Sequence, residues 1–246
     1  MAEPVVLYES SEHIATITIN RPDKRNAING EVSEGLRQAW IRFNASDDRV
    51  AILTGAGDKA FSVGADLGDA PEFWKCTPGV AVPVEKPVIA ALAGWCIGGA
   101  VCLVTFADLC VAADNTRFLY QEAKVGISGG IITALAARIP HKIAMEFILL
   151  GEELGVQRAY EAGLVNKIVP AGQQVAAARD YARKLATLAP MVLAANKRWI
   201  GQMLPKGPTE RAGIARADVM ALELSEDRAE GKKAFFEKRP PRFKGK

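Results

Sequence analysis

The chain has 246 residues, 49% of them hydrophobic, so it can bury one large core, or one core with a small helical appendage. Lys and Arg number 31 against 28 Asp and Glu, and this net charge of +3 is too small to indicate nucleic acid binding. Basic residues nevertheless gather between residues 232 and 246, where they form either a solvated tail or a patch that faces a phosphate.

The amino-terminal segment predicts a β-hairpin followed by a helix. Residues 5–8 and 14–20 alternate or run β-branched, and Ser10-Ser11-Glu12 between them is typical of a turn. Asn29 is the expected N-cap of a helix that ends near Phe43, because apolar residues then recur at helical spacing.

Buried strands are expected next, and helices follow them. The strands are predicted at residues 50–54, 88–92 and 109–113. Their order with the intervening helical segments favours right-handed crossovers and a largely parallel sheet. From Gly129 onward the pattern is helical, except for a strand at residues 164–169. The predicted carboxy-terminal helices cover residues 173–188, 190–203, 208–225 and 227–238.

The sequence therefore predicts an α/β core in residues 1–190 and a helical module in residues 191–246. The start of the chain has no signal-peptide pattern, no apolar run reaches about 18 residues, and the cysteines form no C-x-x-C pair. We expect a cytoplasmic protein with reduced thiols and no membrane partner. His13 and His141 have no acidic or thiol partner at ligand spacing, so no metal site is expected.

Two glycine-bearing junctions carry the chemistry of the chain. Residues 61–67 read FSVGADL and residues 94–100 read GWCIGGA, and each follows an apolar run and precedes a helix-like pattern. Such junctions expose backbone N–H groups that no helical hydrogen bond uses. Two donors of this kind can converge on one developing oxyanion.

The ordered motifs of the chain resemble those of the crotonase (enoyl-CoA hydratase/isomerase) family. These motifs are NRPDKRNA at residues 20–27, FSVGADL at 61–67, KPVIAA at 86–91 with Gly98-Gly99, EAKVGI at 122–127, AGLV at 162–165 and FFEKRPPRFKG at 235–245. The resemblance spans nearly the whole chain. It implies a spiral ββα core followed by helices that pack trimers, commonly paired into hexamers.

The same resemblance implies the parts of an acyl-CoA site. The backbone N–H groups of Ala65 and Gly99 are expected to hold the thioester oxygen of the substrate and to stabilise its enolate, with no cofactor besides the CoA of the substrate. Lys238 is expected to contribute from the same or a neighbouring subunit. The predicted substrate and CoA contacts are Lys24, Arg25, Ala27, Val63, Ala65, Asp66, Leu67, Gly98, Gly99, Tyr120 and Lys238.

The carboxylates depart from the family pattern. Hydratases of this family place water between two glutamates, and here Glu122 occupies the second position whereas Cys102 occupies the first. A thiol does not replace a carboxylate in orienting water. Glu122 as a single acid/base favours isomerisation of an enoyl-CoA double bond. The alternatives for Glu122 are a surface carboxylate or an ion-pair partner of Lys124.

Two other functions stay open at this stage. One is an enoyl-CoA hydratase or dehydratase, similar to carnitinyl-CoA dehydratase, in which the Tyr120 hydroxyl stands in for the missing carboxylate. The other is a binder of acyl-CoA or RNA without chemistry, suggested by Cys102 and the basic ending. Residues 68–85, which lie between the two expected donors, are the predicted region of acyl specificity.

Overall fold

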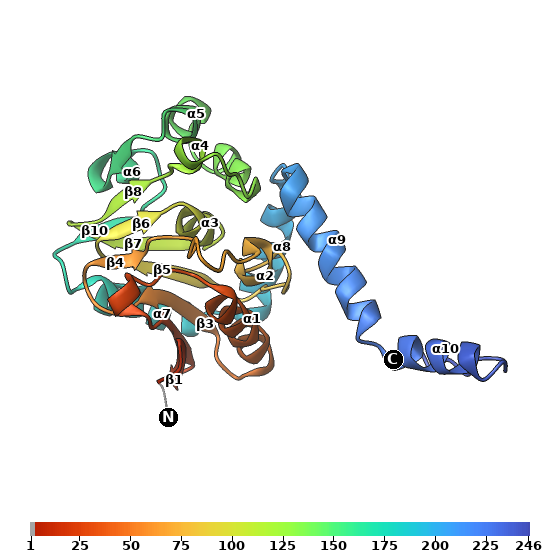
Figure 1. The fold of residues 1–246 in the computed structure, drawn as a ribbon. Coiled ribbons are helices and arrows are strands. Elements are labelled where there is room, and N and C mark those ends of the chain that lie inside the picture. The colour runs from red at the N-terminus through yellow and green to blue at the C-terminus, as the bar shows by residue number, and fades with distance from the viewer. Residues whose placement is uncertain (1–2) are drawn as a thin grey trace.

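A six-stranded sheet forms the centre of the computed structural model, which describes residues 3–246 (Figure 1). Its strand order is β1-β2-β3-β5-β7-β10, and β1 and β2 pair antiparallel while the other neighbours are parallel. The strands are β1 (Val6–Ser11), β2 (Ile14–Ile19), β3 (Val50–Gly55), β5 (Val88–Leu92), β7 (Leu109–Ala113) and β10 (Lys167–Val169). The prediction of a largely parallel sheet is confirmed.

A second sheet of short strands accompanies the first. It contains β4 (Ala60–Ser62), β6 (Trp95–Ile97), β8 (Arg117–Leu119) and β9 (Glu153–Gly155), in that order. In sequence β4 follows β3, β6 follows β5 and β8 follows β7, and each pair is followed by a helix. The chain therefore passes three times from the large sheet to the small one, which is the predicted ββα spiral.

Helices cover both sheets and form the carboxy-terminal part of the chain. Those of the core are α1 (Gly30–Ala45), α2 (Phe73–Cys76), α3 (Gly99–Thr105), α4 (Glu122–Val125), α5 (His141–Leu150), α6 (Val156–Glu161) and α7 (Gln174–Ala186), with 3₁₀ turns η1 (Pro22–Lys24) and η2 (Ile131–Ala137). The predicted N-cap of α1 is confirmed, since the side chain of Asn29 accepts a hydrogen bond of 3.0 Å from the Val32 N–H.

The central strands of the large sheet are buried on both faces. Ala51 and Leu53 of β3 join the core cluster that contains Trp40 of α1. Val50 and Ile52, which alternate with them, join a second cluster that α7 covers. Burial of both faces explains the continuous apolar runs by which the strands were recognised.

Three local predictions were wrong. The hairpin turn lies at Glu12 and His13, not at residues 10–12, because both residues adopt left-handed backbone with φ of 56° and 59°. The strand predicted at residues 164–169 is shorter, since Leu164 and Val165 donate backbone hydrogen bonds to Ala159 in the turn that ends α6. Strand β9 was not predicted, because three residues carry no readable periodicity.

Helices α8 (Pro190–Met203), α9 (Pro208–Glu223) and α10 (Glu226–Phe236) complete the chain. Figure 1 shows α9 extending away from the sheets and α10 at its far end. Many large apolar side chains of these helices are exposed, including Trp199, Met203, Leu222, Phe235 and Phe236. No helix among residues 3–246 has the length and apolar character needed to cross a membrane. The division at residues 190 and 191 stays a prediction.

Candidate active site

The first glycine junction is held by a backbone bridge to the segment that precedes α1. The Ile28 N–H donates to the Gly64 carbonyl and the Asp66 N–H donates to the Ile28 carbonyl, both at 2.8 Å. In this parallel pattern the N–H of Ala65, between the two bonded residues, points away from Ile28. Within residues 3–246 no acceptor is found for the Ala65 N–H. The bridge therefore leaves this donor available.

The second junction lies directly beside the first. Gly99 is the first residue of α3, so no intrahelical acceptor exists for its N–H. A Cβ atom on Gly64 would stand 3.2 Å from the Gly99 nitrogen and 2.5 Å from the Ile97 oxygen, and Gly64 has a φ of +83°. Only glycine permits this approach of the two chains. The structure brings the two predicted donor segments together.

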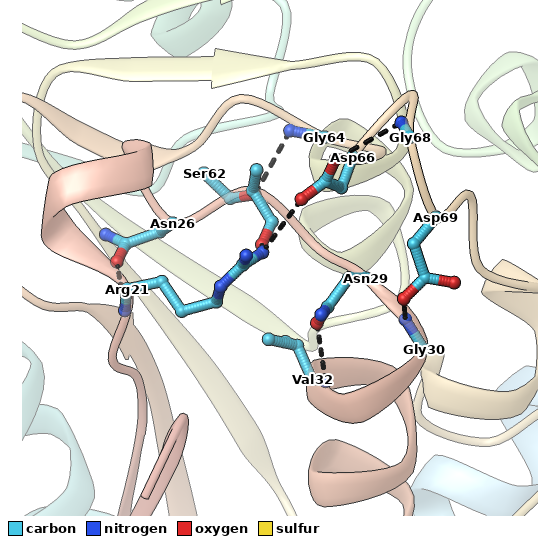
Figure 2. A network of polar contacts seen from close by, with 11 residues as sticks. Arg21, Asn26, Asn29, Gly30, Val32, Ser62, Gly64, Asp66, Gly68 and Asp69 are labelled. Carbon is cyan, nitrogen blue, oxygen red and sulfur yellow. Dashed lines mark hydrogen bonds and ion pairs between the residues drawn. The ribbon is translucent and has the colours of Figure 1, made fainter. Parts of the chain in front are cut away.

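A polar network fixes the segment around Ala65 (Figure 2). The guanidinium of Arg21 binds the Asp66 carboxylate at 3.2 Å and the Ala27 carbonyl at 2.7 Å. The Gly64 N–H donates to the Ser62 hydroxyl at 3.1 Å, and Asp69 accepts from the Gly30 N–H at the start of α1. The side chain of Asp66, predicted as a CoA contact, thus holds the loop together.

The predicted CoA segment runs alongside the same junction. The backbone N–H of Val63 donates to the Arg25 carbonyl at 3.1 Å. Lys24 and Arg25 are exposed, Ala27 is buried, and Leu67 is 74% exposed. The backbone of Arg25 therefore lies beside this junction, and the exposed side chains of Lys24 and Arg25 stay the predicted contacts for the phosphates of CoA.

Lys238 does not join this group within one chain. It follows α10, which Figure 1 shows far from the sheets. Its neighbour Arg239 pairs with Glu230 at 2.6 Å and lowers the pKa of that carboxyl to about 2. Contact of Lys238 with CoA, from the same or a neighbouring subunit, stays a prediction.

Glu122 begins α4, three residues after the last residue of strand β8, which pairs with β6. Its Oε2 accepts hydrogen bonds from the Tyr120 phenol and, at 3.1 Å, from the Gly129 N–H. Within residues 3–246 no hydrogen bond reaches its Oε1. Lys124 donates to the Gly151 carbonyl at 2.8 Å, so the ion pair with Glu122 that remained possible is not formed. One carboxylate oxygen is held and the other is available.

The Tyr120 phenol is a dedicated donor to this carboxylate. Tyr120 is 3% exposed, and burial together with the nearby Glu122 carboxylate raises its pKa well above the usual value. The phenol consequently keeps its proton over the working range of pH. The sequence indicated the hydroxyl of Tyr120 as a polar group of the site but not its bond to Glu122, because spacing alone does not show which way a side chain points.

Cys102 lies on α3, one helical turn after Gly99, and is 2% exposed. Burial raises the pKa of its thiol well above 9.0, and the negative charge of Glu122 raises it further. The residue at the position of the missing glutamate is thus a neutral thiol near Glu122. A neutral thiol is a poor base and a poor orienting group for water.

Comparison with known proteins gives one consistent result. The family model described as enoyl-CoA hydratase/isomerase matches residues 9–246. The chain is 35% identical to (E)-benzylidenesuccinyl-CoA hydratase of Thauera aromatica, over 98% of this chain and 99% of that protein. It is 36% identical to carnitinyl-CoA dehydratase of Salmonella typhi, over 95% of each.

Solved structures agree with these relatives. Carnitinyl-CoA hydratase from Mycobacterium avium has a TM-score of 0.78 and 33% identity, over 100% of both chains. Enoyl-CoA hydratase from Mycobacterium tuberculosis H37Rv has a TM-score of 0.77 and 37% identity, over 99% of this chain and 100% of that one. Fold and sequence therefore point to the same group of proteins.

The buried thiols predict a loss of stability in alkaline solution. Burial raises the pKa of Cys76 from 9.0 to about 12, and it also raises the pKa values of Cys96, Cys102 and Cys110. In the unfolded chain these thiols lose protons first, so the stabilisation is complete below about pH 8.5 and declines as the pH rises toward the folded values. Each thiol lowers the free energy of unfolding by up to about 1.4 kcal/mol per pH unit in this range.

Urea unfolding at intervals between pH 7.5 and 10.5 measures this slope. In the Cys76→Ala variant the slope should decrease by the share of one thiol. A free energy of unfolding that stays constant above pH 9 would contradict the prediction.

Proposed function

Because the chain belongs to the enoyl-CoA hydratase/isomerase family, we propose that its substrate is an enoyl-CoA thioester whose carbonyl oxygen binds between the N–H groups of Ala65 and Gly99. These two donors have no acceptor among residues 3–246 and lie on adjoining segments. One donor of this kind contributes about 3 to 4 kcal/mol to an oxyanionic transition state. The enolate is stabilised by the backbone, so the reaction requires no further cofactor.

The reaction proposed first is the addition or removal of water at the α,β double bond. The relatives named above are hydratases and dehydratases, which favours this chemistry over the isomerisation predicted from a lone glutamate. Glu122 Oε1 takes a proton from water as the water oxygen bonds to the β carbon. The same carboxyl then delivers the proton to the α carbon as the enolate collapses.

The observation that carries this proposal is the unequal environment of the two oxygens of Glu122. Tyr120 and Gly129 hold Oε2, so the carboxylate is oriented without a second glutamate. Glu122 lies in the segment that follows β8, and Gly99 lies in the segment that follows the neighbouring strand β6. A positioned carboxylate next to an oxyanion site is the minimum that proton transfer to an enolate requires.

Double-bond isomerisation is the second candidate, supported by Cys102. A neutral thiol at this position leaves water with one orienting carboxylate, whereas a shift of a double bond needs only one group that moves a proton between two carbons. A binder without chemistry has less support. Its support was the basic carboxy-terminal segment, but there Arg239 pairs with Glu230 and Glu237, so this cation is already neutralised within the chain.

Labelled water distinguishes the two reactions. With crotonyl-CoA in H₂¹⁸O, hydration should place ¹⁸O in the β-hydroxyl of the product. With a 3-enoyl-CoA in D₂O, an isomerase should yield the conjugated 2-enoyl-CoA, with exchange at the α or γ carbon. An enzyme that shows neither incorporation nor isomerisation with a panel of enoyl-CoA thioesters would contradict the proposed function.

Variants of Glu122 and Tyr120 test their separate roles, proton transfer for Glu122 and orientation of its carboxylate for Tyr120. Glu122→Gln should lower kcat by about 10² to 10⁴, because the proton-transferring group is removed. Tyr120→Phe removes one hydrogen bond to a charged group and should lower kcat by about 10- to 100-fold with less effect on KM. Glu31→Gln, an exposed carboxylate of α1, is the matched control. Wild-type kcat in Glu122→Gln would exclude Glu122 as the base.

We also propose that the chain associates into trimers or pairs of trimers through α8, α9 and α10. The support is the apolar surface of these helices, where Trp199 is 58% and Met203 is 85% exposed. In such an assembly Lys238 reaches the CoA site of a neighbouring subunit. Sedimentation should give three or six times the chain mass of 26.4 kDa, and Trp199→Glu should lower it. A wild-type mass near one chain would contradict the proposal.

A further inference from the structure

One aromatic side chain lies directly against the oxyanion donor Gly99. A Cβ atom added to Gly99 would stand 2.1 Å from Cζ and 2.3 Å from Cε1 of Phe73. The edge of the Phe73 ring therefore occupies the space beside the Gly99 Cα, and the absence of a side chain at Gly99 is what admits the ring. Phe73 is the first residue of α2, in the segment predicted to set acyl specificity, and it is only partly buried.

The short helix that carries Phe73 is anchored on several sides. The Trp40 indole N–H donates to the Cys76 carbonyl at 2.8 Å, and the Thr77 hydroxyl donates to the Phe73 carbonyl at 2.7 Å. The first bond ties α2 to the buried Trp40 of α1, and the second closes α2 at its own carboxyl end, where Cys76 and Thr77 are each 0% exposed. Such anchoring keeps the ring in place against Gly99.

The neighbouring aromatic residue faces a different element. A Cβ atom on Gly213 of α9 would stand 2.9 Å from the Trp74 Cβ, so Trp74 packs against α9. Glu72, just before α2, pairs with Arg216 of the same helix at 3.3 Å. Phe73 and Trp74 thus belong to one helix, but the three atoms nearest the Cβ position of Gly99 all belong to Phe73, whereas Trp74 packs on α9.

The position of the ring decides which acyl groups fit. An oxygen bound to the Gly99 N–H lies about 2.9 Å from that nitrogen. The α and β carbons of the acyl group then lie near Gly99, against which the Phe73 ring packs. A large substituent on these carbons competes with the ring for the same space, whereas a slender chain passes beside it.

We infer that Phe73 is a specificity-determining residue that selects acyl groups with small substituents at the α and β carbons and rejects bulky ones such as aryl groups. The inference rests on the proposed function, because it assumes that the thioester oxygen binds at Gly99. It adds the class of acyl group to the proposed function, because Ala65, Gly99 and Glu122 act on the part of the thioester that all enoyl-CoA substrates share.

The test compares two thioesters that differ at the β carbon, crotonyl-CoA with a methyl group and cinnamoyl-CoA with a phenyl ring. Wild type should prefer crotonyl-CoA in kcat/KM. Phe73→Ala should raise the ratio of cinnamoyl-CoA to crotonyl-CoA by about tenfold or more, the range in which one hydrophobic contact discriminates substrates. The ratio in Phe73→Leu should lie between those of wild type and Phe73→Ala. Trp74→Leu, the matched control on the same helix, should leave the ratio unchanged.

A binding measurement separates this inference from the proposed reaction. Calorimetric Kd values for butyryl-CoA and 3-phenylpropionyl-CoA need no turnover, and Phe73→Ala should shift their ratio in the same direction. Discrimination in binding without turnover of either enoyl-CoA supports the role of Phe73 and overturns the proposed reaction. A ratio that is unchanged in Phe73→Ala, or equally changed in Trp74→Leu, overturns the role of Phe73. Absence of binding to every thioester overturns both.

Discussion

The parallel pairing of three short strands is the constraint on which the rest of the site depends. Strands β4, β6 and β8 lie side by side and point the same way, so their carboxyl ends meet at one edge. Ala65 follows the first strand, Gly99 the second and Glu122 the third. Segments almost sixty positions apart in the chain therefore end at the same edge of the small sheet.

Close approach of backbones is the second requirement, and glycine meets it twice. Gly64 lies so near Ile97 and Gly99 that any side chain would collide with the facing backbone. Gly99 instead makes room for the ring of Phe73. The same glycine-rich junctions thus expose donors and shape the space beside them, so the proposed stabilisation of an enolate and the proposed selection of the acyl group depend on the same residues.

The environment of Glu122 explains how a site with one carboxylate stays organised. In place of a second glutamate, the structure has a buried phenol that keeps its proton and a backbone N–H, both directed at one oxygen of Glu122. Cys102 stays neutral because it is buried. The negative charge of the site is thereby concentrated on a single group whose orientation is determined by its neighbours.

The long buried elements could be predicted from the sequence, because each carries a repeating physical signal. The strands β5 and β7 were predicted with their observed bounds, and the cap of α1 at Asn29 was predicted correctly. Strands β4, β6 and β9 have three residues each, too few for a periodic pattern, although two of them precede the proposed oxyanion donors. The site motifs could be recognised for another reason, because they depend on residue identity, namely glycines and a glutamate just after strands, and not on a periodic pattern.

The sequence by itself determined the family, the types of residue available to the site and the departure at Cys102, because these depend on residue identity and order. Only the tertiary structure decided that the phenol of Tyr120 holds Glu122, that Lys124 does not, and that Phe73 packs on Gly99. Each of these contacts depends on the direction of a side chain across a sheet edge or between helices. That direction follows from packing among distant segments, which no local pattern of residues records.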